Sequence, residues 1–97
     1  MRVDTDLLSS VYTERLQSLR SRAEENGISK SGSVEVLRAR LISNLVLSDM
    51  DLSWEGIQSM SHKELGEVLK VFGIKSSGSH KERRQRLWLH LNYDSRR

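Results

Sequence analysis

The sequence predicts an all-α protein whose helices form two similar halves. Apolar residues recur at helical spacing, and β-branched and aromatic residues never alternate over the length of a strand. The 97 residues include no proline, so nothing forces a kink. A stretch of the second half also repeats a stretch of the first. Because each half is close to the size limit for folding alone, we expect the two to pack into one compact five-helix unit.

The repeat has a period of 46 residues. The first copy reads NGISKSGSVEVLRARLISNL and the second reads FGIKSSGSHKERRQRLWLHL. Nine of the nineteen positions 27–45 are identical to their counterparts at 73–91. Unrelated stretches would match at about one position in fifteen. The two copies therefore predict one shared unit, in which a helix, a Ser/Gly loop and a second helix follow one another.

Glycines and serines mark the ends of the helices. Gly27 and Gly73 each follow an amphipathic stretch and predict a left-handed C-terminal cap. One isoleucine follows each glycine, and we expect it to enter the core. Ser61 and Ser79 each precede a glutamate by three residues, which is the spacing of a capping box. These signals predict helices over about 11–26, 33–46, 53–59, 61–72 and 79–92.

The repeats divide the chain into three segments. Repeat 1 covers 1–47, a short helical connector covers 48–60, and a basic repeat 2 covers 61–94. The connector carries apolar residues, which a free linker would lack. We expect the contact between the repeats to be filled by Leu47, Met50, Leu52, Trp54 and Ile57. The other large apolar side chains expected in the core are Leu65, Leu69, Phe72 and Trp88.

Charge is distributed unevenly along the chain. From residue 75 onward seven basic side chains stand against two acidic ones, a net charge of +5, whereas residues 1–74 carry nine basic and eleven acidic residues. A basic end on an acidic body indicates a polyanionic partner. The chain has no cysteine, which excludes disulfides and thiolate zinc sites, and no apolar run long enough for a bilayer. We expect an intracellular protein, in the nucleoid, cytoplasm or nucleus, without a membrane partner.

The order of residues in each copy resembles the SAP domain. Each copy has a leucine-bearing helix, then Gly-Ile, two polar residues, Ser-Gly, a polar cap and a helix with Arg-Leu near its middle. The resemblance covers about 16–45 and 62–91. It implies a tandem helix–extended loop–helix fold and a chromatin- or nucleoid-associated function. In this family duplex DNA, often AT-rich, is bound by the loop and the start of the second helix, which implies 29–33 and 75–80 here.

Two positions depart from the family pattern. The lysine that usually stands two residues after the loop glycine is Val34 in the first copy and His80 in the second. A leucine of the family's second helix is Leu37 in the first copy but Arg83 in the second. We expect the Arg83 stem to cover core surface with its head in water, or its guanidinium to be recruited to phosphate.

The loop 75–79 and the helix start after it are the strongest candidate for a phosphate-binding site. Unpaired backbone N–H groups point outward at a helix start, glycine permits close approach, and serine hydroxyls add donors. We expect Arg86 to be structural, paired with a carboxylate. The candidate nucleic-acid-binding residues of the second copy are Lys75, Ser76, Ser77, Gly78, Ser79, His80, Lys81 and Arg84. Those of the first copy are Lys30, Ser31, Gly32 and Arg38.

These features predict a non-enzymatic protein that binds duplex DNA mainly through phosphate contacts of the second copy. The three histidines lack metal-ligand spacing, and no catalytic motif or nucleotide-binding glycine loop occurs. We therefore expect no cofactor, metal or small-molecule substrate. Two alternatives use the same helix–loop–helix surface. One is RNA binding, and the other is a protein-interaction module whose acidic first helix would serve a basic partner.

Overall fold

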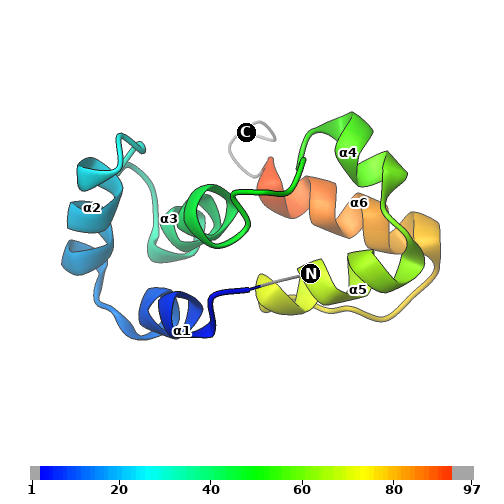
Figure 1. Ribbon diagram of the computed structural model, residues 1–97, viewed down its shortest axis with the longest axis horizontal. Helices are drawn as coiled ribbons and strands as arrows, with labels where there is room; N and C mark the ends of the chain where they lie inside the picture. The colour runs from blue at the N-terminus through cyan, green and yellow to red at the C-terminus, as the bar shows by residue number, and fades with distance from the viewer. Residues whose placement is uncertain (1–2, 93–97) are drawn as a thin grey trace. The chain divides into compact units, whose positions relative to one another are not determined.

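A computed structural model of the protein describes residues 3–92. These residues form six α-helices and one π-helical segment, and no strand occurs among them. The all-α class predicted from the sequence is therefore confirmed. The chain divides into two compact units between Ser48 and Asp49, and each unit has its own three α-helices (Figure 1). The packing of the two repeats into one unit stays a prediction.

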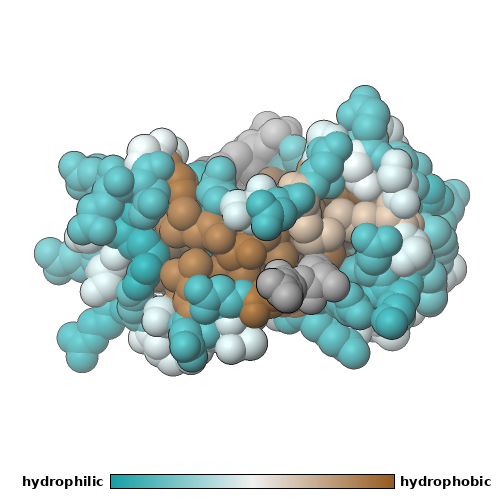
Figure 2. Space-filling model, in the orientation of Figure 1, coloured by the Kyte–Doolittle hydropathy of each residue, from teal (hydrophilic) through white to brown (hydrophobic). Residues whose placement is uncertain are grey.

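The N-terminal unit contains α1 (Thr5–Thr13), α2 (Leu16–Glu25) and α3 (Val34–Leu41), which continues as the π-helical segment η1 (Ile42–Val46). Helix α3 packs against both α1 and α2. Apolar side chains gather on the surface over α1 and α3, whereas hydrophilic ones cover α2 (Figure 2). The buried side chains of this unit are Val11, Leu19, Ala23, Leu37, Leu41, Ile42, Val46 and Leu47.

The C-terminal unit contains α4 (Trp54–Ser59), α5 (His62–Val71) and α6 (His80–Leu91). Helix α6 packs against both α4 and α5. The segment that the sequence analysis assigns to a connector thus supplies a helix of this unit. Its buried side chains are Ile57, Met60, Leu65, Val68, Leu69, Val71, Phe72 and Leu87.

The 46-residue period describes the structure as well as the sequence. A shift of 46 carries α2 onto the bounds of α5, and it carries the first residue of α3, Val34, onto the first residue of α6, His80. It also relates Val11 in α1 to Ile57 in α4, and both side chains are fully buried. Each unit is therefore built from an entry helix, a second helix, a loop and a third helix.

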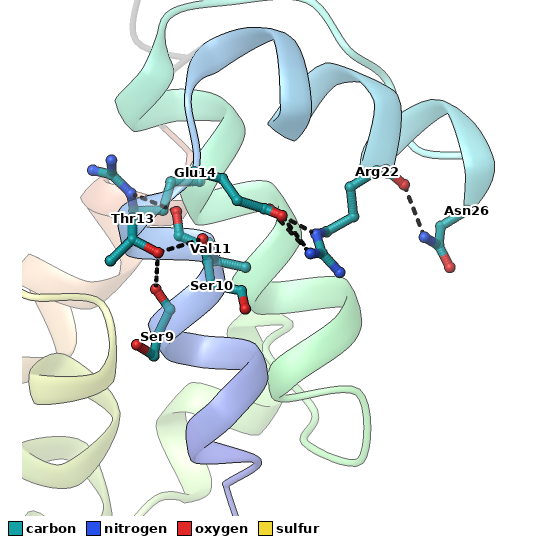
Figure 3. A network of polar contacts seen from close by, with 8 residues as sticks. Ser9, Ser10, Val11, Thr13, Glu14, Arg22 and Asn26 are labelled. Carbon is teal, nitrogen blue, oxygen red and sulfur yellow. Dashed lines mark hydrogen bonds and ion pairs between the residues drawn. The ribbon is translucent and has the colours of Figure 1, made fainter.

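The predicted helix over 11–26 is wrong, because the chain leaves the helical conformation at Glu14 and Arg15, where ψ is 149° and 162°. A continuous helix would place Arg15 on the same face as Val11 and Leu19, which are fully buried. The break leaves Arg15 exposed. Glu14 accepts hydrogen bonds from the guanidinium of Arg22, one of them 3.2 Å from Nε to Oε2 (Figure 3).

The predicted caps are confirmed. Gly27 and Gly73 have φ values of 67° and 69°, the left-handed conformation that glycine adopts without steric cost. In each unit the isoleucine after the glycine donates its N–H back to the preceding helix, at 2.8 Å for Ile28 and 3.1 Å for Ile74. Both isoleucines are half-buried. Capping boxes also occur at the starts of α5 and α6, as their serine–glutamate spacing predicts.

The π-helical segment is a feature that the sequence analysis did not predict. The N–H of Leu47 donates to the carbonyl of Ile42 at 2.9 Å, an i→i−5 bond. Two buried pairs, Leu41–Ile42 and Val46–Leu47, stand five residues apart. The wider π-helical turn brings these pairs closer to one face of the helix, which explains why the hydrogen bond here runs to the fifth residue back and not to the fourth.

The expectation that Trp54 lies in the core is wrong. Its residue is 46% exposed, and its ring meets that of Trp88 edge to face, with 5.1 Å between the ring centroids. Trp88 itself is half-buried. The other large side chains expected in this core, Leu65, Leu69 and Phe72, are buried as predicted.

Because these side chains differ in burial, truncating them should lower the free energy of unfolding by different amounts. Leu69→Ala should lower the free energy of unfolding by about 2–5 kcal/mol, because it opens a cavity among fully buried neighbours. Trp54→Ala should cost only about 1 kcal/mol, mainly the edge-to-face contact. Urea denaturation of both variants measures the difference. A loss from Trp54→Ala that equals the loss from Leu69→Ala would contradict the exposed position of Trp54.

Candidate nucleic-acid interface

One arginine of α6 binds the backbone of the loop between α5 and α6. Nη1 of Arg86 donates to the carbonyl oxygens of Lys75 and Ser77, at 2.9 and 2.6 Å. Gly78 lies against this guanidinium and has a φ of 114°, so a side chain there would be strained. Arg86 therefore has the structural role that we expected, and its charge also acts on the carboxylate of Glu82, whose pKa it lowers. The bonded carbonyls would otherwise repel an anion that approaches the loop.

The N-terminal unit builds its loop in the same way. Nη1 of Arg40 donates to the carbonyl oxygens of Ser29 and Ser31, both at 2.8 Å. These three residues lie 46 positions before Arg86, Lys75 and Ser77. Gly32 has a φ of 99°, like its counterpart in the second loop. Identical arginines at matching positions of the repeat were the sequence signal for this contact.

The start of α6 is closed by a complete capping box. The hydroxyl of Ser79 accepts from the N–H of Glu82 at 3.2 Å, and the Glu82 carboxylate accepts from the N–H of Ser79 at 3.0 Å. Hydrogen bonds from the backbone and the side chain of Ser79 to the Glu82 carboxylate, with smaller contributions from Arg86 and Lys75, hold the pKa of that carboxyl below its usual value. Because the pKa is lowered, the cap is intact at neutral pH and is lost only as the pH falls through that lowered pKa.

The cations of the predicted site differ in exposure and in their hydrogen bonds to the rest of the protein. Lys75 and Lys81 are exposed on the loop and on the first turn of α6. Arg84, the third predicted cation of this unit, is half-buried. Its Nη1 donates to Oε1 of Gln58 at 2.7 Å, which ties α6 to α4. Of these three cations, the two lysines are exposed, whereas Arg84 is bonded within the unit.

Two further side chains turn toward the protein. Nε2 of His80 lies 3.1 Å from the carbonyl oxygen of Met60, at the end of α4. Nη1 of Arg83 donates to the carbonyl oxygen of His62 at 2.6 Å, so its head is bonded to the start of α5, whereas its buried Nε has no hydrogen-bond partner. Gly66 makes room for it, since an added Cβ would lie 2.6 Å from this guanidinium. The remaining predicted residues, Ser76, Ser77, Gly78 and Ser79, lie together along the loop.

In the N-terminal unit the predicted cations are already paired. Lys30 forms an exposed ion pair with Glu24, with 3.1 Å between Nζ and Oε2. Arg38 was expected beside the loop with Ser31 and Gly32, but it turns to α1. Its Nε donates to the carbonyl oxygen of Val11 at 3.3 Å, and its guanidinium lies 5.0 Å from the ring centroid of Tyr12. The N-terminal loop thus keeps its geometry with fewer available cations.

Within residues 3–92, no group of three or more metal-ligating side chains could hold an ion. No helix in this range is long and apolar enough to cross a membrane. Two basic residues counted toward the charge of the C-terminal end, Arg96 and Arg97, lie outside the described residues.

The arginine contact generates a matched pair of predictions. Arg86→Met should lower the free energy of unfolding by about 1–2 kcal/mol, because it leaves two carbonyls without their donor. Amide hydrogen exchange should become faster over 75–79 and stay unchanged over 29–33. Arg40→Met should show the reverse pattern. Unchanged exchange in both loops would show that the arginines do not hold them.

Comparisons with known protein families, with curated proteins and with solved structures found no match to this chain.

Proposed function

We propose that this chain is a non-enzymatic DNA-binding protein with two SAP-like repeats. It holds duplex DNA mainly through phosphate contacts from the loop 75–79 and the first turn of α6. One observation carries the proposal. A loop whose carbonyls are bonded to Arg86 leads directly into a capped helix start, where Lys75 and Lys81 are exposed.

The electrostatics of this helix start favour an anion. The first backbone N–H groups of α6 have no partner within the helix, and the positive end of the helix dipole lies behind them. Glu82 opposes an anion, but one of its oxygens is already bonded to the N–H of Ser79. Lys75 and Arg86 both lie close enough to Glu82 to lower its pKa. Two cations, Lys75 and Arg86, therefore oppose the charge of this carboxylate.

The N-terminal loop supports a secondary role. The counterparts of Lys75 and Lys81 in this unit are Ser29 and Glu35. Lys30 is occupied by Glu24 and Arg38 by α1. Each third helix has one acidic residue in its first turn, Glu35 or Glu82. The first unit therefore differs in having no unpaired predicted cation beside the same backbone geometry, which makes it a weaker phosphate ligand.

The protein-interaction alternative has less support. Two of the acidic residues that would serve a basic partner, Glu14 and Glu24, are paired with Arg22 and Lys30 inside the same unit. RNA offers the same phosphate chemistry as DNA, so the two are compared in one titration with matched duplexes of each kind.

Binding should depend on salt. If about three cations reach phosphates, the slope of log K against log salt concentration should lie near −3, since each neutralised phosphate contributes about −0.9. Fluorescence anisotropy with a labelled duplex at several salt concentrations measures this slope. A flat response would mean that the basic loop is not the binding surface.

Charge reversal should locate the site. Lys75→Glu with Lys81→Glu should weaken duplex binding roughly 100-fold and reduce the salt slope by about two, because two phosphate contacts are replaced by repulsion. Both side chains are exposed, so the melting temperature should change little.

The matched control reverses Arg20 and Lys30, two exposed cations of the N-terminal unit, with the same change in net charge. It should weaken binding only slightly at the same salt concentration. An equal loss of duplex affinity in the two double variants would show that both loops bind DNA. A larger loss from the N-terminal pair would move the site to that loop.

A further inference from the structure

The C-terminal unit exposes an aromatic pair that its counterpart lacks. Trp54 in α4 is 46% exposed and contacts Trp88 in α6 at an interplanar angle of 73°. The matching positions of the N-terminal unit hold Leu8 and Ile42, and Ile42 is only 1% exposed. The repeat therefore accommodates an aliphatic pair at this place. The second unit instead carries two large rings, one of them half in solvent.

These rings continue the cationic stripe of α6. Lys81, Arg84 and Trp88 are spaced by three and four residues, so they share one face of the helix. Helix α4 lies along that face, because Trp54 contacts Trp88 and Gln58 accepts from Arg84. Cations and rings thus form one edge, which we call the α4/α6 edge: Trp54, Gln58, Lys81, Arg84 and Trp88.

The chemistry of this edge fits a strand with unpaired bases. Every base has a π-face that stacks on an aromatic ring without regard to sequence, and neighbouring cations bind the phosphates between bases. An edge-to-face pair covers only one ring face, so other indole surface stays available. A basic partner would be repelled by Lys81 and Arg84, whereas a polyanion would be attracted.

The length of the edge also fits. Seven residues separate Lys81 from Trp88, about 10 Å along the helix axis. A stacked strand advances about 3.4 Å per nucleotide, so roughly three nucleotides span the distance. A phosphate at the loop and a base on the Trp54 ring can therefore belong to one short strand.

We propose that Trp54 is a stacking platform for an unpaired base of a single-stranded nucleic acid, whose phosphates run along Lys81 toward the loop 75–79. This inference rests on the proposed function, because it uses the same phosphate-binding loop. It adds a preference for single strands, or for duplexes with a single-stranded overhang, over blunt duplexes.

The test compares a mixed-sequence single strand with its blunt duplex, as DNA and as RNA. The single strand should quench the tryptophan fluorescence of the protein, while the blunt duplex should quench it far less. Trp54→Leu, which restores the residue of the N-terminal repeat, should weaken single-strand binding about tenfold or more and duplex binding less than twofold. Trp54→Phe should retain most of the single-strand affinity, since a ring is still present.

Tyr12→Leu is the matched control, because Tyr12 is the exposed aromatic residue of the N-terminal unit, at 37% exposure. It should leave both affinities unchanged. Duplex binding without quenching by the single strand would overturn the platform and leave the proposed function standing. Equal losses of single-strand and duplex affinity in Trp54→Leu would also overturn the platform. Failure of both nucleic acids to bind at low salt would overturn the proposed function and the platform together. RNA binding with the same pattern as DNA would support the platform for both.

Discussion

The contact between one guanidinium and two loop carbonyls is the constraint on which each unit depends. In both units the chain leaves its second helix through a left-handed glycine and must then start a new helix within a few residues. Arg40 and Arg86 hold the connecting loops by binding the carbonyls that have no helical partner. An arginine suits this task because its planar head carries several donors and stays charged. The glycine of each loop lets the backbone turn beside that head.

The two units show how one scaffold was adapted at a few positions. Leu37 is fully buried in the first unit, whereas its counterpart Arg83 sends its head to the start of α5. The change is possible because Gly66 stands where the first unit has Arg20, and it leaves space for the guanidinium. A charged head near a core costs desolvation unless its donors are satisfied, and the bond to the His62 carbonyl satisfies one of them.

The functional difference that we propose between the units follows from charge and not from backbone geometry. Both loops have the same glycine conformations and the same arginine contact. Only the C-terminal loop adds exposed lysines at its two sides, and only its unit exposes a tryptophan next to the third helix. We therefore infer that the loop geometry common to both units stabilises the loops. The lysines and the tryptophan that only the C-terminal unit exposes would contact the nucleic acid. Phosphate contacts supply affinity without reading sequence, and a stacked base would add the strand preference.

The sequence by itself determined the local features of this protein. Helical class, serine caps, capping boxes and left-handed glycines follow from short-range rules, because the groups involved lie within four residues of one another. The repeat could also have predicted the break at Glu14 and Arg15, since Met60 and Ser61 separate the equivalent helices. Tertiary structure decided where the long side chains go. Arg38, Arg84 and Arg86 look alike in sequence, yet they reach a carbonyl of α1, a glutamine of α4 and the carbonyls of a loop. It also decided the exposure of Trp54. The long cationic side chains and the Trp54 ring contact partners that are remote in sequence. Only the packing of the helices brings those partners into reach, and the core of so small a protein leaves some large side chains exposed.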